Sequence, residues 1–340
     1  MNTMNCARAA TFGFGRAVSI GALMIVAAAA FGMPQARAAD AAQQAAATKK
    51  NLAAAKQKTY ATPEEAAKDL MAAVKANNPN ALLPILGPQA KPLVSSGDKV
   101  ADRDGAERFL RSYEEANKLE KSGDAKAILV TGKDDWPFPI PIVKESDGWR
   151  FDTQAGGQEI LNRRIGRNEL NTVQAMLAYV DAQQEYYLRN PQKSQLLQYA
   201  QKFISTPGKR DGLYYPTKAG EPPSPLGPAF EGARAKGYAQ AEGDQPGAFH
   251  GYRYRILKAQ GPGAPGGAYD YLVKGGMMGG FALVAWPATY GNSGVMTFLV
   301  NHEGTVYEKD LGPETPTAAQ KITKFDPDQS WNKVGNPGKK

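Results

Sequence analysis

The chain has 340 residues, a net charge of +8 from 41 Lys and Arg against 33 Asp and Glu, and a single cysteine, Cys6. The basic excess is spread along the chain without a patch of stacking aromatic residues, so a nucleic-acid-binding surface is not expected. One cysteine also excludes an internal disulfide framework.

Residues 1–38 have the features of a secretory signal peptide. Two arginines precede an apolar run at residues 17–31, and Ala36-Arg37-Ala38 provides the small residues of a cleavage site. We predict cleavage after Ala38 and a periplasmic or secreted protein without a membrane span after cleavage. Cys6 would leave with the signal. Residues 39–59 are rich in Ala, Gln and Lys and are predicted to form a disordered leader.

Residues 60–160 are predicted to form an N-terminal α+β domain. Thr62-Pro63 and Asn78-Pro79 each pair an N-cap residue with a proline at the first helical position, which predicts two helices. A third helix is expected over residues 105–119. Strands are predicted at residues 127–130, 142–143 and 149–152, with the proline-rich segment 136–141 as an edge.

Residues 161–312 are predicted to pair a long helix with an antiparallel sheet. The segment from Glu169 to Arg189 has no Gly or Pro, and its apolar residues alternate at three- and four-residue spacing. These positions are Leu170, Val173, Leu177, Val180 and Tyr187. We expect this face to cover the sheet, with Leu177 and Val180 buried against Phe298.

Asn190-Pro191 is expected to end this helix and to start another one through Phe203. The Gly- and Pro-rich segment 206–249 is predicted to be a functional or mobile loop. Four strands follow, and a helix begins at Thr315-Pro316 within the C-terminal segment 313–340. The strands are expected at residues 250–257, 281–286, 295–301 and 305–311.

Three resemblances accompany this α+β pattern. The order of elements in the N-terminal domain is similar to the cone-shaped nuclear-transport-factor-2-like fold. The C-terminal pattern includes Gly251-Tyr252, Phe281-Ala282-Leu283 and Gly304, and it resembles the globular head of type IV pilins and pseudopilins. The mature chain also resembles the exported domain-of-unknown-function family numbered 2950. The segments that carry this last likeness are residues 136–141, 162–169 and 264–270.

An arginine cluster lies around the predicted start of the long helix. Its cations are Arg163, Arg164 and Arg167, and the carboxylates near them in sequence are Asp152, Glu159 and Glu169. Matching numbers of opposite charges favour structural ion pairs that join the two domains. A binding site for an anion or a carboxylate is the alternative, and it would leave at least one arginine unpaired.

A calcium site is a second hypothesis. Asp326, Asp328 and Ser330 place oxygen atoms at alternate positions, as calcium-binding loops do. Pseudopilin heads often hold calcium near their C-termini, so that resemblance implies the same ion. The pattern is incomplete, because Trp331 replaces the usual glycine and no Glu closes the loop.

The sequence contains no catalytic signature, and its two histidines, His250 and His302, have no partner ligands at metal-binding spacing. We therefore expect a non-catalytic binding or scaffolding role at the cell envelope without a cofactor. The partner would be an envelope protein or a small ligand. The alternatives are a hydrolase, or a small-ligand binder, that uses a pocket of carboxylates and arginines between the domains.

Overall fold

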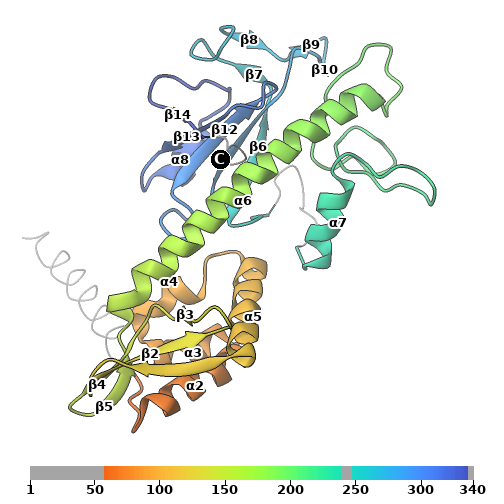
Figure 1. Ribbon diagram of the computed structural model, residues 1–340. Helices are drawn as coiled ribbons and strands as arrows, with labels where there is room; N and C mark the ends of the chain where they lie inside the picture. The colour runs from red at the N-terminus through yellow and green to blue at the C-terminus, as the bar shows by residue number, and fades with distance from the viewer. Residues whose placement is uncertain (1–56, 239–246, 336–340) are drawn as a thin grey trace, which may run out of the picture. The chain divides into compact units, whose positions relative to one another are not determined.

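A computed structural model describes residues 57–238 and 247–335 (Figure 1). The predicted signal peptide and residues 39–56 of the predicted leader lie outside these ranges. The described residues belong to one compact unit of the chain. The protein is α+β, as expected. The predicted domain boundaries at residues 160 and 312 stay predictions.

The N-terminal helices begin at the capping signals of the sequence. Thr62 Oγ1 accepts a hydrogen bond from the Glu65 N–H, and Asn78 Oδ1 accepts one from the Asn80 N–H. The third long helix begins six residues before its predicted start, because Asp98 caps it. The helical segments are α2 (Pro63–Lys75), α3 (Pro79–Leu86), the 3-10 turn Pro88–Ala90, α4 (Lys91–Val94) and α5 (Lys99–Glu115).

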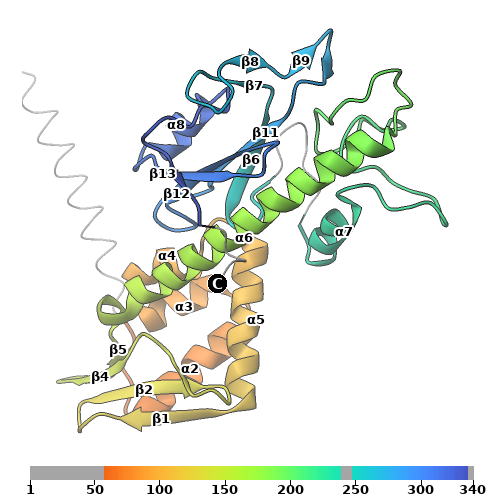
Figure 2. The same cartoon turned by 45° about the horizontal axis from the view of Figure 1, so that its top comes forward.

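An antiparallel sheet packs against these helices. Its hydrogen-bonded order is β1-β2-β4-β5 (Figure 2), and β3 pairs with β2. The strands are β1 (Asn117–Lys121), β2 (Lys126–Thr131), β3 (Trp136–Pro137), β4 (Ile142–Glu145) and β5 (Gly148–Phe151). The sequence correctly predicted β2, β4 and β5, but β1 was missed. A hydrophobic core of α2, α3 and sheet residues, such as Leu70, Ile85 and Leu129, joins the two layers.

The long helix α6 (Thr153–Arg189) begins 16 residues before the expected Glu169. Asp152 caps its N-terminus by accepting a hydrogen bond from the Ala155 N–H at 3.1 Å. Gly156 is needed near this end, because a Cβ there would lie 2.1 Å from the Pro139 carbonyl oxygen. Asn190 ends the helix in the left-handed conformation, with φ 44°.

The second sheet has the order β14-β13-β12-β11-β6, and all its pairs are antiparallel. The meander of β11, β12 and β13 was predicted. The strands are β6 (Tyr252–Leu257), β11 (Ala282–Pro287), β12 (Met296–Asn301), β13 (Val306–Asp310) and β14 (Asn332–Lys333). Two small ribbons lie outside this sheet, and they pair β7 (Ala259–Gln260) with β8 (Tyr269–Asp270) and β9 (Leu272–Val273) with β10 (Gly276–Met277).

The long helix packs on this sheet, but its buried face is centred on other residues than those expected. Val180 and Phe298 are buried in one core and Leu177 packs against it, whereas Leu170 is exposed. The buried residues in its C-terminal half are Thr172, Val173, Met176, Tyr179, Val180, Ala182, Gln183 and Tyr186.

Two other expectations differ from the structure. The segment after Asn190 is not the predicted helix, since residues 191–205 form turns and isolated bridges. The segment 206–249 contains a helix that was not predicted, α7 (Gly227–Ala235). The expected C-terminal helix is present as α8 (Thr315–Gln320). None of the described helices is both long and apolar enough to cross a membrane.

Candidate ligand pocket

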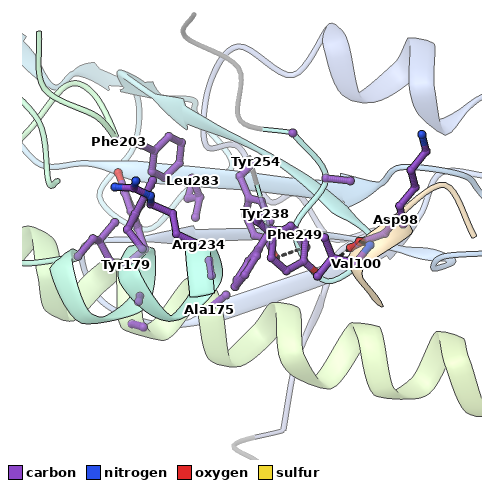
Figure 3. A pocket seen from close by; sticks show the side chains of 18 of the residues that line it. Asp98, Val100, Ala175, Tyr179, Phe203, Arg234, Tyr238, Phe249, Tyr254 and Leu283 are labelled. Atoms are coloured by element: carbon purple, nitrogen blue, oxygen red, sulfur yellow. Dashed lines mark hydrogen bonds between the residues drawn. The ribbon is translucent and has the colours of Figure 1, made fainter. Parts of the chain in front are cut away.

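A cavity of about 600 Å³ lies between α6, α7, the start of α5 and the β6–β11 face of the second sheet (Figure 3). We call it the Ala178 pocket. The residues that line it are Gly97, Asp98, Lys99, Val100, Ala175, Ala178, Tyr179, Phe203, Leu226, Ala229, Phe230, Ala233, Arg234, Tyr238, Gly247, Ala248, Phe249, Tyr254 and Leu283. Small-molecule sites typically occupy roughly 300–1,000 Å³, so this volume is ample for a small ligand.

Alanines on two helices keep the pocket open. Ala175 and Ala178 are three residues apart on α6, and Ala229 and Ala233 are four residues apart on α7, so each pair occupies one helix face. Ala178 and Ala229 are exposed as well as lining the cavity. Larger side chains at these positions would fill the space.

The position of α7 is fixed by contacts with the preceding loop. The rings of Phe230 and Tyr214 stack at 5.0 Å between centroids. The Leu226 N–H donates to the Leu213 carbonyl at 3.1 Å. The wall that α7 contributes is therefore a packed helix.

Asp98 forms one end of the pocket. Its Oδ1 accepts hydrogen bonds from the Val100 and Ala101 N–H groups and caps α5. Its Oδ2 accepts from the Tyr238 hydroxyl at 2.9 Å and from the Gly251 N–H at 3.0 Å. This buried carboxylate has four donors, so its role is structural: it joins α5 to residues 238 and 251.

Arg234 lies at the end of the pocket where Tyr179 and Phe203 are seen, away from Asp98 and Val100 (Figure 3). Its side chain has no hydrogen-bond or ion-pair partner among residues 57–238 and 247–335. Lys99 adds a second cation to the lining. The lining holds one carboxylate and two cations, and the oxygens of the carboxylate are already hydrogen-bonded, so the charged groups still able to donate to a ligand are the cations.

The phenols of the pocket stay protonated at neutral pH. Burial raises the pKa of Tyr179 and of Tyr254 well above the ordinary value. Burial and the charge of Asp98 raise the pKa of Tyr238 in the same direction. His250 lies beside Tyr238 and Phe249, and burial lowers its pKa. The three tyrosines therefore provide neutral aromatic walls.

The arginine cluster of the sequence does not line this pocket. Arg163 Nε lies 2.6 Å from Glu159 Oε1, one helical turn away, and its guanidinium stacks 4.6 Å from the centre of the Trp136 ring. Arg164 has no ion-pair partner within residues 57–238 and 247–335. It donates to the carbonyls of Pro92 and Leu93, at 2.7 Å for Pro92, and to Asn292 Oδ1 at 2.5 Å.

The other cluster residues lie apart. Asp152 caps α6, and Glu169 Oε1 accepts hydrogen bonds from the Val295 and Met296 N–H groups at 2.9 and 3.0 Å. Burial, and then the nearby Arg108, lower the pKa of Arg167. The six residues are therefore distributed along α6 and do not converge on one point.

The residues of the calcium hypothesis make separate contacts. Asp326 Oδ1 accepts from the Gly263 N–H at 2.7 Å, whereas Asp328 Oδ1 accepts from the Ser330 N–H at 2.8 Å and from the Ser330 hydroxyl. Within the described ranges, no group of three or more His, Cys, Asp or Glu residues is arranged to hold a metal ion. Calcium binding here stays a sequence-based prediction.

Sequence reasoning missed the pocket, although one signal pointed near it. The Gly- and Pro-rich segment 206–249 was predicted to be functional or mobile, and it supplies Leu226, α7 and Phe249 to the lining. The alanine pairs did not indicate a cavity in the sequence, because Ala has the highest helix propensity and is common in helices of every kind.

Comparison with known proteins identifies the family. Residues 57–334 match the family model described as "Protein of unknown function (DUF2950)", so the chain belongs to this family. The resemblance noted in the sequence is thereby confirmed for the family. The chain matches no curated protein and no solved structure.

Proposed function

We propose that the protein is a non-catalytic binding protein of the cell envelope that holds an elongated amphiphile in the Ala178 pocket. The observation that carries the proposal is a cavity of about 600 Å³ kept open by alanines from two helices. Apolar and aromatic side chains dominate its walls, as in sites that bury most of a small ligand.

The ligand's polar end is anionic and lies at Arg234. That guanidinium has no partner in the described part of the chain and lies at the far end from the saturated Asp98. An anionic head there would gain a charge-assisted hydrogen bond while the apolar body contacts Phe230, Phe249 and Leu283. Among the described residues the lining has no Ser, Thr, Cys or His, and its tyrosines are held protonated by burial, which favours binding over catalysis by these groups.

Binding is tested by calorimetry with dodecanoate and dodecanol as probes. Wild-type protein is expected to bind both, with dodecanoate about fivefold tighter. Arg234→Gln should remove this preference. Lys99→Gln, which removes a cation beside Asp98, is the matched control and should keep it. If neither probe binds, the pocket proposal is wrong. Equal binding of both probes by the wild type would disprove only the role of Arg234.

A filled pocket gives the second test. Ala178→Leu should weaken dodecanoate binding about tenfold or more, because the added side chain occupies the ligand's volume. Ala155→Leu adds the same group at an exposed position of α6 outside the pocket and should leave binding unchanged. Equal effects of the two substitutions would place the ligand elsewhere.

Export is the other part of the proposal. Its support is the signal-like sequence of residues 1–38. The exported protein should begin at Ala39, which intact-mass measurement of the periplasmic fraction can establish. Recovery of a species that still begins at Met1 from that fraction would contradict this part.

The likeness to pilin heads and to the nuclear-transport-factor-2-like cone remains hypothetical. A long helix on an antiparallel meander supports the first, and helices against a twisted antiparallel sheet support the second. Neither likeness is needed for the pocket proposal, which depends on the lining residues alone.

A further inference from the structure

A second surface of the chain combines exposed leucines with lysines. It is formed by the end of α6 with the segment after it, residues 188–201, and by the β9–β10 ribbon with its turn, residues 272–278. The Tyr199 N–H donates to the Met277 carbonyl at 2.7 Å, and the Gln201 side chain donates to the Gly275 carbonyl at 2.7 Å. These contacts make the two segments one surface, which we call the Leu196 surface.

Large apolar side chains are concentrated there. Across residues 57–238 and 247–335, seven large hydrophobic side chains are exposed, and four of them belong to the Leu196 surface. They are Leu188, Leu196, Leu197 and Val273, with 76%, 66%, 39% and 46% of their surface accessible. Two of the four are adjacent in sequence, so this is not the scattering of single apolar residues that is normal on protein surfaces.

The charges of this surface have one sign. Residues 188–201 and 272–278 contain Arg189, Lys193 and Lys274 but no Asp or Glu. Arg189 is paired with Glu185 of its own helix, whereas both lysines lie at turns with positive φ, 53° and 49°. The lysines are exposed, so their charges are available to an external anion.

We infer that the Leu196 surface docks on an anionic lipid bilayer. Leucine and valine side chains enter the boundary between headgroups and acyl chains, and neighbouring lysines contact lipid phosphates. A second copy of the chain fits less well, because a symmetric pair would bring the lysines of both copies to one interface. An acidic protein surface would pair with the two lysines, but its charges would not bury the four exposed apolar side chains as a bilayer does.

A site-specific fluorophore tests this docking. Leu196→Cys and Leu170→Cys are each labelled with an environment-sensitive nitrobenzoxadiazole group in a Cys6→Ser background. Leu170, at 61% accessible, is equally exposed on α6 but lies outside the surface, which makes it the matched control. A local reporter also separates contact at this surface from any attachment through the N-terminal segment.

Vesicles of equimolar phosphatidylglycerol and phosphatidylcholine should shift the emission of the Leu196 label to shorter wavelength and leave the Leu170 label unchanged. Lys193→Gln with Lys274→Gln should weaken the response, by about fivefold for each lysine. Pure phosphatidylcholine should give a much weaker response.

Three results would overturn the inference. The first is a Leu196 label that stays silent with anionic vesicles, and the second is an equal response of both labels. The third is a shift of the Leu196 label that depends on protein concentration without vesicles, since this would identify a second copy as the occupant. The dodecanoate experiment is independent, so failure of one proposal leaves the other standing.

Discussion

Small residues occur in two stretches of α6, and they serve opposite purposes. Near its N-terminus, Gly156 lets the helix approach the Pro139 carbonyl so closely that a single Cβ would overlap it. Near its C-terminus, Ala175 and Ala178 line a cavity, and Ala178 is exposed. A small side chain thus indicates either tight packing or a binding site, and only the neighbouring atoms distinguish the two.

Arginines show the same contrast. Arg164 is half-buried, and its guanidinium donates to two backbone carbonyls of α4 and to Asn292, so it holds α6 to α4 and to the turn that carries Asn292. Arg234 lines the cavity without a partner in the described chain. A saturated cation stabilises a fold, whereas an unsatisfied cation beside a cavity is available to a ligand. The predictions below test these contrasts.

The largest effect is expected at Gly156. Gly156→Ala places a Cβ 2.1 Å from the Pro139 carbonyl oxygen, so backbone must move, at a loss of about 3 kcal/mol of unfolding free energy. Gly166→Ala is the control on the same helix, with no atom within 4 Å, and should gain about 0.5–1 kcal/mol because Ala favours helix. Urea unfolding measures both. Similar midpoints would contradict the close approach of α6 and Pro139.

Arg164→Met should lower the unfolding free energy by about 2 kcal/mol, because three acceptors lose a charged donor. Arg163→Met should cost under about 1 kcal/mol, since its ion pair with Glu159 is partly exposed. Thermal unfolding with and without phosphate distinguishes a structural role from an anion site. A wild type stabilised by phosphate, with this response lost in Arg164→Met, would favour the anion site.

The same contrast explains which structural features could be predicted from the sequence: those set by neighbouring residues, and not those set by contacts with distant ones. Local signals located the Thr62 and Asn78 caps, the strands β2, β4 and β5 and the strands of the meander, but they missed β1, and Asn190-Pro191 predicted a helix that is not present. Gly156 failed as a signal, because a glycine that ordinarily weakens a helix is here required by a contact with a distant proline. Because Gly166 also precedes Glu169, the start of α6 was placed too late.

The buried face of α6 failed for a related reason. Aliphatic spacing favoured Leu170, which is exposed, and passed over Gln183, which is fully buried. The Gln183 amide donates to the Ala200 carbonyl and accepts from the Ala200 N–H, at 2.8 Å each. A polar residue can occupy a core when the fold provides a hydrogen-bond donor and an acceptor for its side chain. The sequence does not show which backbone groups will take these roles. The Ala178 pocket was missed because a cavity left by small side chains has no recognisable sequence pattern.

The third prediction compares two alanines one turn apart. Ala178→Leu should change the unfolding free energy by less than about 1 kcal/mol, because its side chain enters the cavity. Ala182 is buried in the core, so Ala182→Leu should cost about 1–3 kcal/mol through overpacking. Denaturant unfolding of both variants measures the difference. Equal losses would show that the pocket wall is packed like the core.

The smallest effect concerns the pH dependence of stability at His250, which packs beside Tyr238 and Phe249. Burial lowers the pKa of His250 below its ordinary value of 6.5, with Lys236 acting in the same direction and Asp98 and Asp104 opposing. As the pH falls through 6.5, the unfolded chain binds a proton on this imidazole before the folded chain does. The wild type therefore loses stability below this pH. The full contribution of the neutral His250 to the free energy of unfolding is present only above it.

His250→Asn removes this titration and keeps a residue that tolerates the positive φ of 53° at this position. The difference in unfolding free energy between wild type and variant should change in favour of the variant between about pH 7.5 and about pH 5.5. Urea unfolding at both values measures it. A difference that is constant over this window would mean that the imidazole is as solvated in the folded protein as in the unfolded chain. The packing of the imidazole against Tyr238 and Phe249 would then not keep water from it.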